Sequence, residues 1–317
     1  MVGGWWLLVS GWNRRKKILA ILTGTLILAT VAGALYERHA VRRDVRRFPP
    51  PGRLVDVGGR RLHLLCIGMG SPVVLFEQAG FANSASFAVA RTAISAHTRV
   101  CSYDRVGIGW SDPAPRTVTA GMMADDLRRL LDASGITNPI VIVASSIGGV
   151  TAELFARRYP DRLAGLIFLD AGNSEAAART VASHAMLPVS LGCGAAQAVG
   201  AVGLLRLIDP WDLRREKSAQ NERSAALMYG SKPWVMLCAI VRGAHDTLEE
   251  FAAAPPLRRE LPGRRSARKR GRAFCPRPSR ESSARRAETL QTSARPIDTW
   301  RGSQRVERGG WFPAAIT

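Results

Sequence analysis

The sequence predicts an α/β fold, in which a mostly parallel sheet is flanked by helices, carries a helical insertion and follows one N-terminal transmembrane helix. Three observations predict it. Apolar strand-like runs alternate with amphipathic stretches between residues 53 and 171, as they do in βαβ units. Residues 173–257 are rich in Ala and Leu and contain no clear strand run. An uncharged run of 19 residues lies near the N-terminus, at 18–36.

The run at 18–36 predicts the transmembrane helix. At about 1.5 Å per residue, a helix of this length just crosses a hydrocarbon layer of about 30 Å. Basic residues flank the run on both sides, which is typical of membrane interfaces but assigns no side of the membrane. These residues are Arg14, Arg15, Lys16 and Lys17 before the run, and Arg38, Arg42, Arg43, Arg46 and Arg47 after it. We therefore expect residues 1–47 to form a single-pass N-terminal anchor in a membrane.

Two alternatives to the anchor stay open. Ala32, Gly33 and Ala34 resemble the small-x-small cleavage site of a signal peptide, which is removed from the mature protein. A long apolar helix can also belong to the core of a globular domain. The basic clusters on both flanks do not favour that second alternative.

A domain over 53–262 is predicted to follow the Pro-rich spacer at 49–52, which is stiff and not helical. Alternating or continuous apolar runs predict its strands. These strands are 60–67, 73–76, 99–103, 140–144 and 166–169. Apolar residues at helical spacing predict two helices, at 122–133 and 147–159. The fully apolar strand at 140–144 is expected to be covered on both faces of the sheet.

Most of the formal charge of +20 lies at the two ends of the chain. Residues 1–47 carry +7 and residues 258–308 carry +11, whereas the stretch between them carries only +2. No specific binding of nucleic acid is therefore expected of the central domain. Residues 263–317 are rich in Arg, Ser and Pro without apolar periodicity, which predicts a disordered basic tail. Binding of nucleic acid or anionic lipid by this tail is a further interpretation.

The five cysteines show neither a C-x-x-C pair nor a nearby histidine cluster, so no metal site and no cofactor are expected. Their odd number does not favour a disulfide framework. We expect them to be buried, apolar free thiols, as isolated cysteines usually are. They are Cys66, Cys101, Cys193, Cys238 and Cys275.

The run 143–149 joins an apolar strand directly to a predicted helix and contains the pattern small-x-Ser-x-Gly at 144–148. This pattern predicts a sharp turn on which the Ser146 hydroxyl projects above the sheet, where it can act as a nucleophile. The N-terminus of the following helix offers N–H groups and a favourable dipole to a developing oxyanion. A serine that only caps the helix is the alternative.

Four ordered blocks weigh against that alternative. The most specific is the D-R-x-G-x-G-x-S-D-P run at 104–113, and with the others it resembles the α/β-hydrolase fold family, of the serine hydrolase or esterase type. The resemblance covers residues 53–260. The blocks are 73–80, 98–113, the Ser146 turn, and 158–161 together with 166–171.

The resemblance implies a role for each matching residue. Ser146 would be the nucleophile, and the backbone N–H groups of Ile147 and Phe81 would bind the oxyanion. Asp170 would be the triad acid, although a structural aspartate at a strand end is an equal interpretation. Residues 173–257 would form the cap that shapes the pocket. The implied substrate is a small-molecule or lipid-like ester, and no cofactor is implied.

The catalytic base that the family places near the C-terminus is missing, because no histidine follows His245. The sequence after residue 262 also shows no pattern that predicts the last two strands of the family sheet. His184 and His245 lie in the cap region and are interpreted as solvated or capping residues. A serine is a weak nucleophile without a base, so we expect trace activity at most. A non-catalytic binding or scaffold domain on the same fold is the alternative function.

Overall fold

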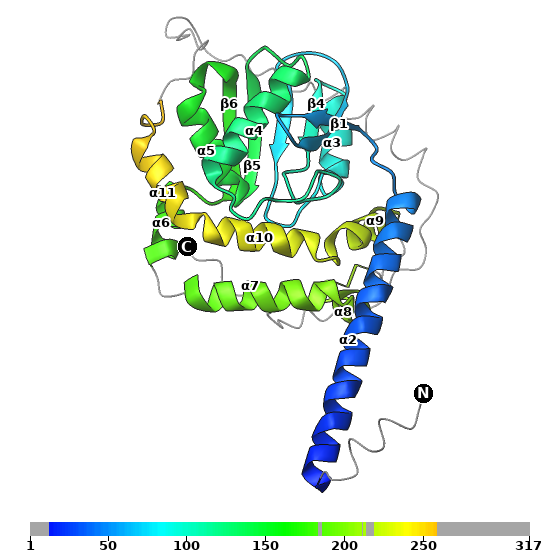
Figure 1. Cartoon of the computed structure of the whole chain (residues 1–317). Helices are drawn as coiled ribbons and strands as arrows, with labels where there is room; N and C mark the ends of the chain where they lie inside the picture. Colours follow the sequence, from blue (N-terminus) through cyan, green and yellow to red (C-terminus); the bar gives the residue numbers. More distant parts are fainter. Residues whose placement is uncertain (1–12, 183–185, 211, 214–218, 259–317) are drawn as a thin grey trace, which may run out of the picture. The chain divides into compact units, whose positions relative to one another are not determined.

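The computed structural model describes residues 13–182, 186–210, 212–213 and 219–258 (Figure 1). Within these residues six strands form one sheet, in the order β1-β2-β4-β3-β5-β6. β3, β4, β5 and β6 pair in parallel, whereas β1 and β2 are antiparallel, so the sheet is mostly parallel as predicted. The strands are β1 Arg53–Asp56, β2 Arg61–Ile67, β3 Val74–Glu77, β4 Val100–Tyr103, β5 Ile140–Ser146 and β6 Leu163–Ala171.

Helices cover both faces of the sheet, which explains why the central strands are continuously apolar. Phe76, Val100 and Val143 pack on one face with α3 (Ala88–Ser95). Side chains of the opposite pleat, such as Leu75 and Ile142, belong to the main core. Helices α4 (Ala120–Ala133) and α5 (Gly148–Arg158) complete that core, followed by the 3₁₀ turn η1 (Pro160–Arg162). The apolar stripe predicted for α4 is buried as expected, at Met123, Leu127, Leu130 and Leu131.

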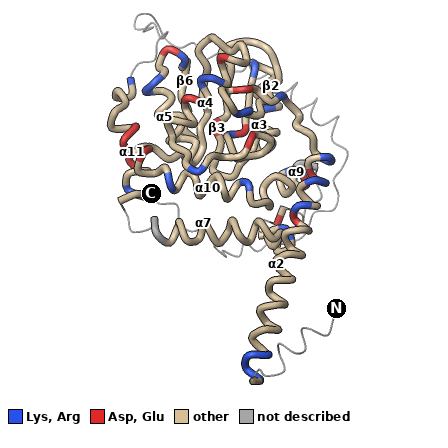
Figure 2. Tube along the Cα trace, viewed as in Figure 1, with Lys and Arg blue, Asp and Glu red and all other residues tan. Residues whose placement is uncertain are grey.

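The stretch after β6 is helical, and no strand occurs among its described residues (Figure 1). We call its helices the cap helices. They are α6 Ser174–Ala182, α7 Met186–Ala201, α8 Leu204–Ile208, α9 Ala219–Met228, α10 Lys232–Arg242 and α11 Ala244–Ala253. Helix α7 packs against α10, and α11 packs against α6 and α4. Figure 2 shows that α7 carries no charged side chain.

Four of the five cysteines are paired, so the expectation of free thiols is wrong for them. Cys66 on β2 and Cys101 on β4 face each other in the antiparallel register and form a disulfide. A second disulfide joins Cys193 on α7 to Cys238 on α10. Both pairings depend on which strands and helices become neighbours, and cysteine spacing does not encode that. Cys275 lies outside the described residues.

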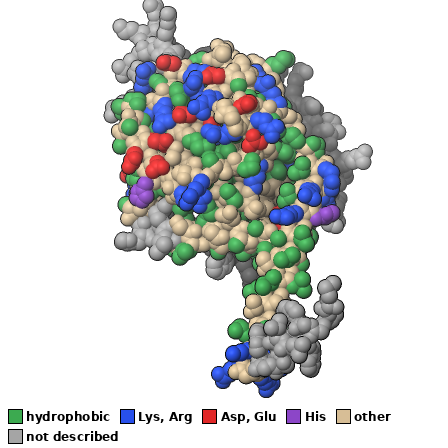
Figure 3. All heavy atoms as spheres, viewed as in Figure 1, with side chains coloured by type: hydrophobic (Ala, Val, Ile, Leu, Met, Phe, Trp, Pro, Cys, Tyr) green, Lys and Arg blue, Asp and Glu red, His purple; other side chains and the backbone are tan. Residues whose placement is uncertain are grey.

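The apolar run at 18–36 lies within one helix, α2 (Arg14–Arg47), which is longer than predicted in both directions. Asn13 caps its start through a bond from the Lys16 N–H to its side-chain oxygen, at 3.0 Å. Among the described residues it is the one unbroken helix long and apolar enough to cross a membrane, and its most apolar window is unburied (Figure 3). Leu26 is 68 % exposed and Leu28 is 70 % exposed, so α2 is not a buried helix of the domain core. The prediction for the tail at 263–317 lies outside the described residues.

A buried ion cluster holds α2 against the cap helices. Arg206 on α8 is 1 % exposed. Its Nε donates to Oε2 of Glu37, and its Nη1 donates to Oδ2 of Asp44, both at 2.6 Å. Burial alone would lower the pKa of Arg206, but the hydrogen bonds and charges of the two carboxylates raise it above its ordinary value. The guanidinium therefore stays charged, and two turns of α2 are fixed to the cap.

Replacing the central cation of this cluster should loosen α2 from the cap. Arg206→Met removes the guanidinium that Glu37 and Asp44 share in a buried place, and such a loss costs about 3–5 kcal/mol of folding free energy. Arg47→Ala is the matched control, because its ion pair with Glu222 is exposed on both sides and its loss should cost less than about 1 kcal/mol. Urea unfolding in mild detergent measures both. Equal small effects would show that the cluster does not hold the helix.

Candidate active site

Ser146 occupies the sharp strand-to-helix turn that the sequence predicts. It is the last residue of β5, its φ is +50°, and its side chain is exposed. Only Ile147 separates it from the first residue of α5, Gly148. A non-glycine residue in this left-handed region costs about 1–3 kcal/mol, so its surroundings must impose the conformation. The first N–H groups of α5 have no partner inside the helix and can bind an anion beside Ser146.

Two glycines allow this turn to pack against its neighbours. A Cβ at Gly148 would lie 2.6 Å from the backbone oxygen of Gln78, at the end of β3. A Cβ at Gly149 would overlap the backbone oxygen of Gly172, just after β6. Both obstacles are backbone atoms, which cannot swing aside as a side chain can. The turn is therefore held between the ends of β3 and β6.

The loop after β3 reaches the same place and carries Phe81. A Cβ at Gly80 would be 3.9 Å from Cγ2 of Ile147, so this loop lies beside the turn. Nη2 of Arg105 donates to the carbonyl oxygens of Gln78 (2.8 Å) and Ala79 (2.6 Å), with a third contact to that of Gly80. Phe81 is half-buried, with its ring 4.7 Å from that of Trp234 on α10. The structure thus brings together Ile147 and the Phe81 loop. Sequence reasoning missed Arg105, although it stands in the D-R-x-G block.

Asp170 lies at the end of β6, next to the Ser146 turn. The strand register skips one residue here, since Ser145 pairs with Leu169 and Ser146 with Ala171. Asp170 is therefore the extra residue of a bulge, with φ +45° and an exposed side chain. Its carboxylate makes no hydrogen bond or ion pair with any described residue. The aspartate is close to the turn along the sheet, but no described histidine is bound to it.

No described side chain hydrogen-bonds the Ser146 hydroxyl, and the described histidines lie elsewhere. His39, His97 and His245 are exposed on helix surfaces or a helix end, and His184 lies outside the described residues. The one described histidine next to a carboxylate is His63, which is fully buried. Its Nε2 accepts from the Gly52 N–H at 3.1 Å, so its Nδ1 carries the proton and faces Ser84 Oγ (3.1 Å) and Asp104 Oδ2 (3.0 Å).

This His63 network is structural. Asp104 also accepts from the N–H groups of Ser84 and Trp110, which ties the D-R-x-G loop to the segment after β3. Asp112, at the other end of the loop, binds Arg61, and that hydrogen bond lowers the pKa of its carboxyl. Both aspartates therefore shape the loop.

A second buried cluster joins the loop to the sheet. The Tyr103 hydroxyl donates to Oε2 of Glu77, and Nη1 of Arg105 lies 3.5 Å from Oε1 of Glu77. Burial raises the pKa of Glu77, while the charge of Arg105 and the Tyr103 hydrogen bond oppose that rise. Burial, followed by the charge of Glu77, raises the pKa of Tyr103 well above its usual value. Arg105 thus neutralises Glu77 while it holds the Phe81 loop.

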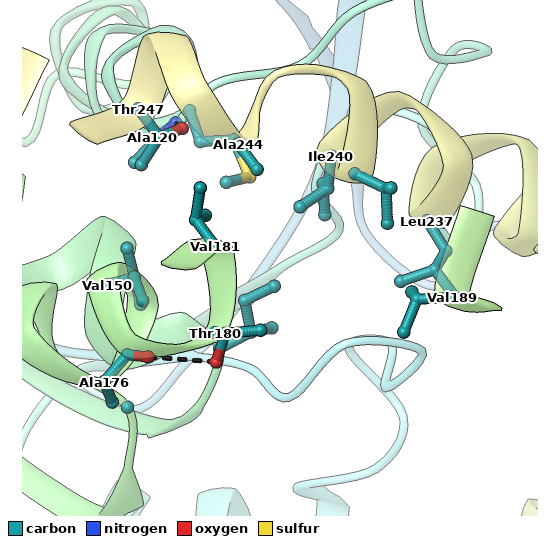
Figure 4. Close-up of a pocket in the computed structure, with 15 residues that line it drawn as sticks. Ala120, Val150, Ala176, Thr180, Val181, Val189, Leu237, Ile240, Ala244 and Thr247 are labelled. Carbon is teal, nitrogen blue, oxygen red and sulfur yellow. Dashed lines mark hydrogen bonds between the residues drawn. The ribbon is translucent and has the colours of Figure 1, made fainter. Parts of the chain in front are cut away.

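An apolar cavity of about 280 Å³ opens next to the turn (Figure 4). Ile147 and Val150 of the turn and α5 line it on one side. Cap helices line the other sides, with Val181 from α6, Val189 from α7 and Ile240 from α10. The apolar lining suits the apolar part of a small molecule that is bound at the turn. In the part of the chain that the structure describes, no group of three His, Cys, Asp or Glu side chains could hold a metal ion.

A sequence model of the α/β hydrolase fold matches residues 72–190, which include β3 to β6 and the Ser146 turn. Over these residues the chain has the α/β-hydrolase fold. This match, together with relatives that are named as hydrolases, supports a hydrolase.

Individual relatives of this hydrolase-fold chain cover only parts of it. An uncharacterized protein of Schizosaccharomyces pombe is 40 % identical over 80 residues, which are 25 % of this chain and 15 % of that protein. The 2-hydroxy-6-oxo-2,4-heptadienoate hydrolase of Pseudomonas putida is 32 % identical over 124 residues, 38 % of this chain and 44 % of the enzyme. The chain thus spans half or less of the length of the curated relatives that it matches.

Among solved structures, an epoxide hydrolase from Vigna radiata has the same fold. It aligns with a TM-score of 0.52 at 19 % identity, over 63 % of this chain and 74 % of that one. At this identity the likeness concerns the fold alone.

A methyl group at the turn should destabilise the domain. Gly149→Ala places a Cβ against the backbone oxygen of Gly172, and such overpacking costs about 1–3 kcal/mol. Gly192→Ala is the matched control, since Gly192 lies inside α7 with open space around it; this change should stabilise the protein by about 0.5–1 kcal/mol. Unfolding free energies from urea titration check both. A neutral Gly149→Ala would show that the turn has room to spare.

Removing the cation beside Glu77 should make stability depend on pH. In Arg105→Met the pKa of Glu77 rises further, because burial is no longer opposed by a positive charge. A carboxyl whose pKa is higher in the folded than in the unfolded state stabilises the fold fully at pH values below its unfolded-state pKa. This contribution is lost as the pH rises through the folded-state pKa. The deficit against the original chain should therefore be larger at about pH 8 than at about pH 5. Adding Glu77→Gln should remove this pH dependence; if it persists, another group is responsible.

Proposed function

We propose that this chain is a membrane-anchored hydrolase of carboxylic esters in which Ser146 is the nucleophile. The backbone N–H groups of Ile147 and Phe81 bind the oxyanion, and Asp170 is the candidate acid. The observation that carries the proposal is the strained conformation of Ser146, whose φ is +50° while its side chain is exposed. A turn that is costly to form and leaves its hydroxyl free is typical of a nucleophile rather than of a helix cap.

The cavity and α2 support the remaining parts of the proposal. The cavity begins at Ile147, the residue after Ser146, and its apolar lining suits the acyl or alkyl part of an ester. Helix α2 exposes its apolar side chains along the run at 18–36, which suits a bilayer. The match to the α/β hydrolase fold supports the hydrolase class, and the ester specificity is our inference from the pocket.

The missing base limits the rate that we expect. A base must lie within about 2.6–3.2 Å of the nucleophile, and no described side chain forms a hydrogen bond with the Ser146 hydroxyl. Removing the base of a well-studied protease leaves a rate only about 10³–10⁴ times that in water, which comes from oxyanion binding and substrate binding. We therefore propose slow turnover.

One observation favours a second candidate function, a protein that binds an apolar ligand without reacting with it. The cavity is complete among the described residues, whereas the triad is not. Such a protein would use the same pocket and would need neither Ser146 nor Asp170.

Replacing the proposed nucleophile separates the two functions. Ser146→Ala should abolish the slow hydrolysis of a short-chain aryl ester and the weak labelling by a fluorophosphonate probe. Ser145→Ala, the same change one residue earlier on β5, should leave both in place. Equal turnover in all three chains would overturn the role of Ser146. Fast turnover that vanishes only in Ser146→Ala would support Ser146 as the nucleophile. It would also contradict the expectation that the chain has no catalytic base.

A further inference from the structure

The cap meets α2 where the apolar run of that helix ends. A Cβ at Gly33 would lie 2.7 Å from the backbone oxygen of Val202, so the two backbones are in close contact. One turn further along α2, Tyr36 packs on Gly203 at the start of α8. Both α2 residues belong to the uncharged run at 18–36. Since a helix of this length only just spans the hydrocarbon layer, its last turn lies at the edge of that layer. The segment 202–203 must lie there too.

The cap surface on this side is apolar and uncharged. The sequence holds no charged residue from 186 to 205, and Figure 2 shows α7 free of charge and running across the direction of α2. Contiguous exposed apolar patches mark contact sites for proteins or membranes, and large apolar side chains of α7 and α8 are exposed here. They are Leu191, Leu204, Leu207 and Ile208.

The ion cluster fixes the orientation of this cap surface relative to α2. Arg206 lies between Leu204 and Leu207 on α8 and binds Glu37 and Asp44 from the opposite, buried side. The exposed leucines therefore lie on the face of α8 that points away from the ion cluster. Val189 lines the apolar cavity, whereas Leu191, two residues later, lies on the opposite side of α7.

We propose that the exposed faces of α7 and α8 form a second membrane contact, at which the cap rests in the interfacial layer of the bilayer that holds α2. The inference rests on the proposed membrane anchor. An apolar helical face without charges, held level with the end of a spanning segment, gains free energy by entering the boundary between headgroups and acyl chains.

Depth-dependent fluorescence quenching tests this contact on the full chain. In a Cys275→Ser background, Leu191→Cys and Leu207→Cys each receive a polarity-sensitive thiol-reactive label. The labelled chains are incorporated into phosphatidylcholine vesicles whose acyl chains are brominated near the glycerol. Val89→Cys is the matched control, since Val89 is 78 % exposed on α3, which packs on the sheet and not on the cap.

We expect brominated lipid to quench about half or more of the fluorescence at positions 191 and 207, and less than about a tenth at position 89, because quenching requires contact with the acyl chains. Chains that float with the vesicles but show no quenching at 191 and 207 would overturn the second contact and leave the anchor in place. Chains that do not float would overturn the anchor and this inference together. In neither case does ester hydrolysis enter the readout.

Discussion

At the end of β5 the chain passes from strand to helix through the single residue Ile147, and the space around that passage leaves no room for a side chain at Gly148 or Gly149. The ends of β3 and β6 close it from both sides. Because those neighbours are backbone, the strained conformation of Ser146 is imposed by the sheet itself. The Phe81 loop, the Asp170 bulge and the mouth of the cavity all take their places around this one fixed point.

Much of the fold could be predicted because its signals are local. The apolar runs at 73–76, 99–103 and 140–144 became β3, β4 and β5 almost within their predicted limits. Strand β1 was not predicted, since it has only two apolar residues between Arg53 and Asp56, and helix α3 was not predicted, since eight residues are too short to show a period. The length of α2 was underestimated, because its last turns are amphipathic and bury Glu37 and Asp44, which hydropathy assigns to solvent.

In the candidate site too, the features set by neighbouring residues were predicted and those set by distant residues were not. Its turn is encoded by neighbouring residues and was predicted, although the roles of Ser146, Ile147, Phe81 and Asp170 stay predictions. Arg105 was missed because its partners are three carbonyl oxygens some 25 residues away, and backbone groups leave no pattern in a sequence. The disulfide between Cys66 and Cys101 was missed for a related reason, since only the register of β2 against β4 brings the two residues together.

The two disulfides indicate on which side of a bilayer the domain would lie. Cystines persist in oxidising spaces and are rare in the cytosol, where thioredoxin and glutathione keep thiols reduced. Cys66–Cys101 in the sheet and Cys193–Cys238 in the cap both follow α2 in the sequence. For a spanning α2, oxidation of these pairs requires the domain on the exoplasmic or luminal side. Residues 14–17 would then face the cytoplasm, and the basic residues at 38–47 would lie on the same side as the domain.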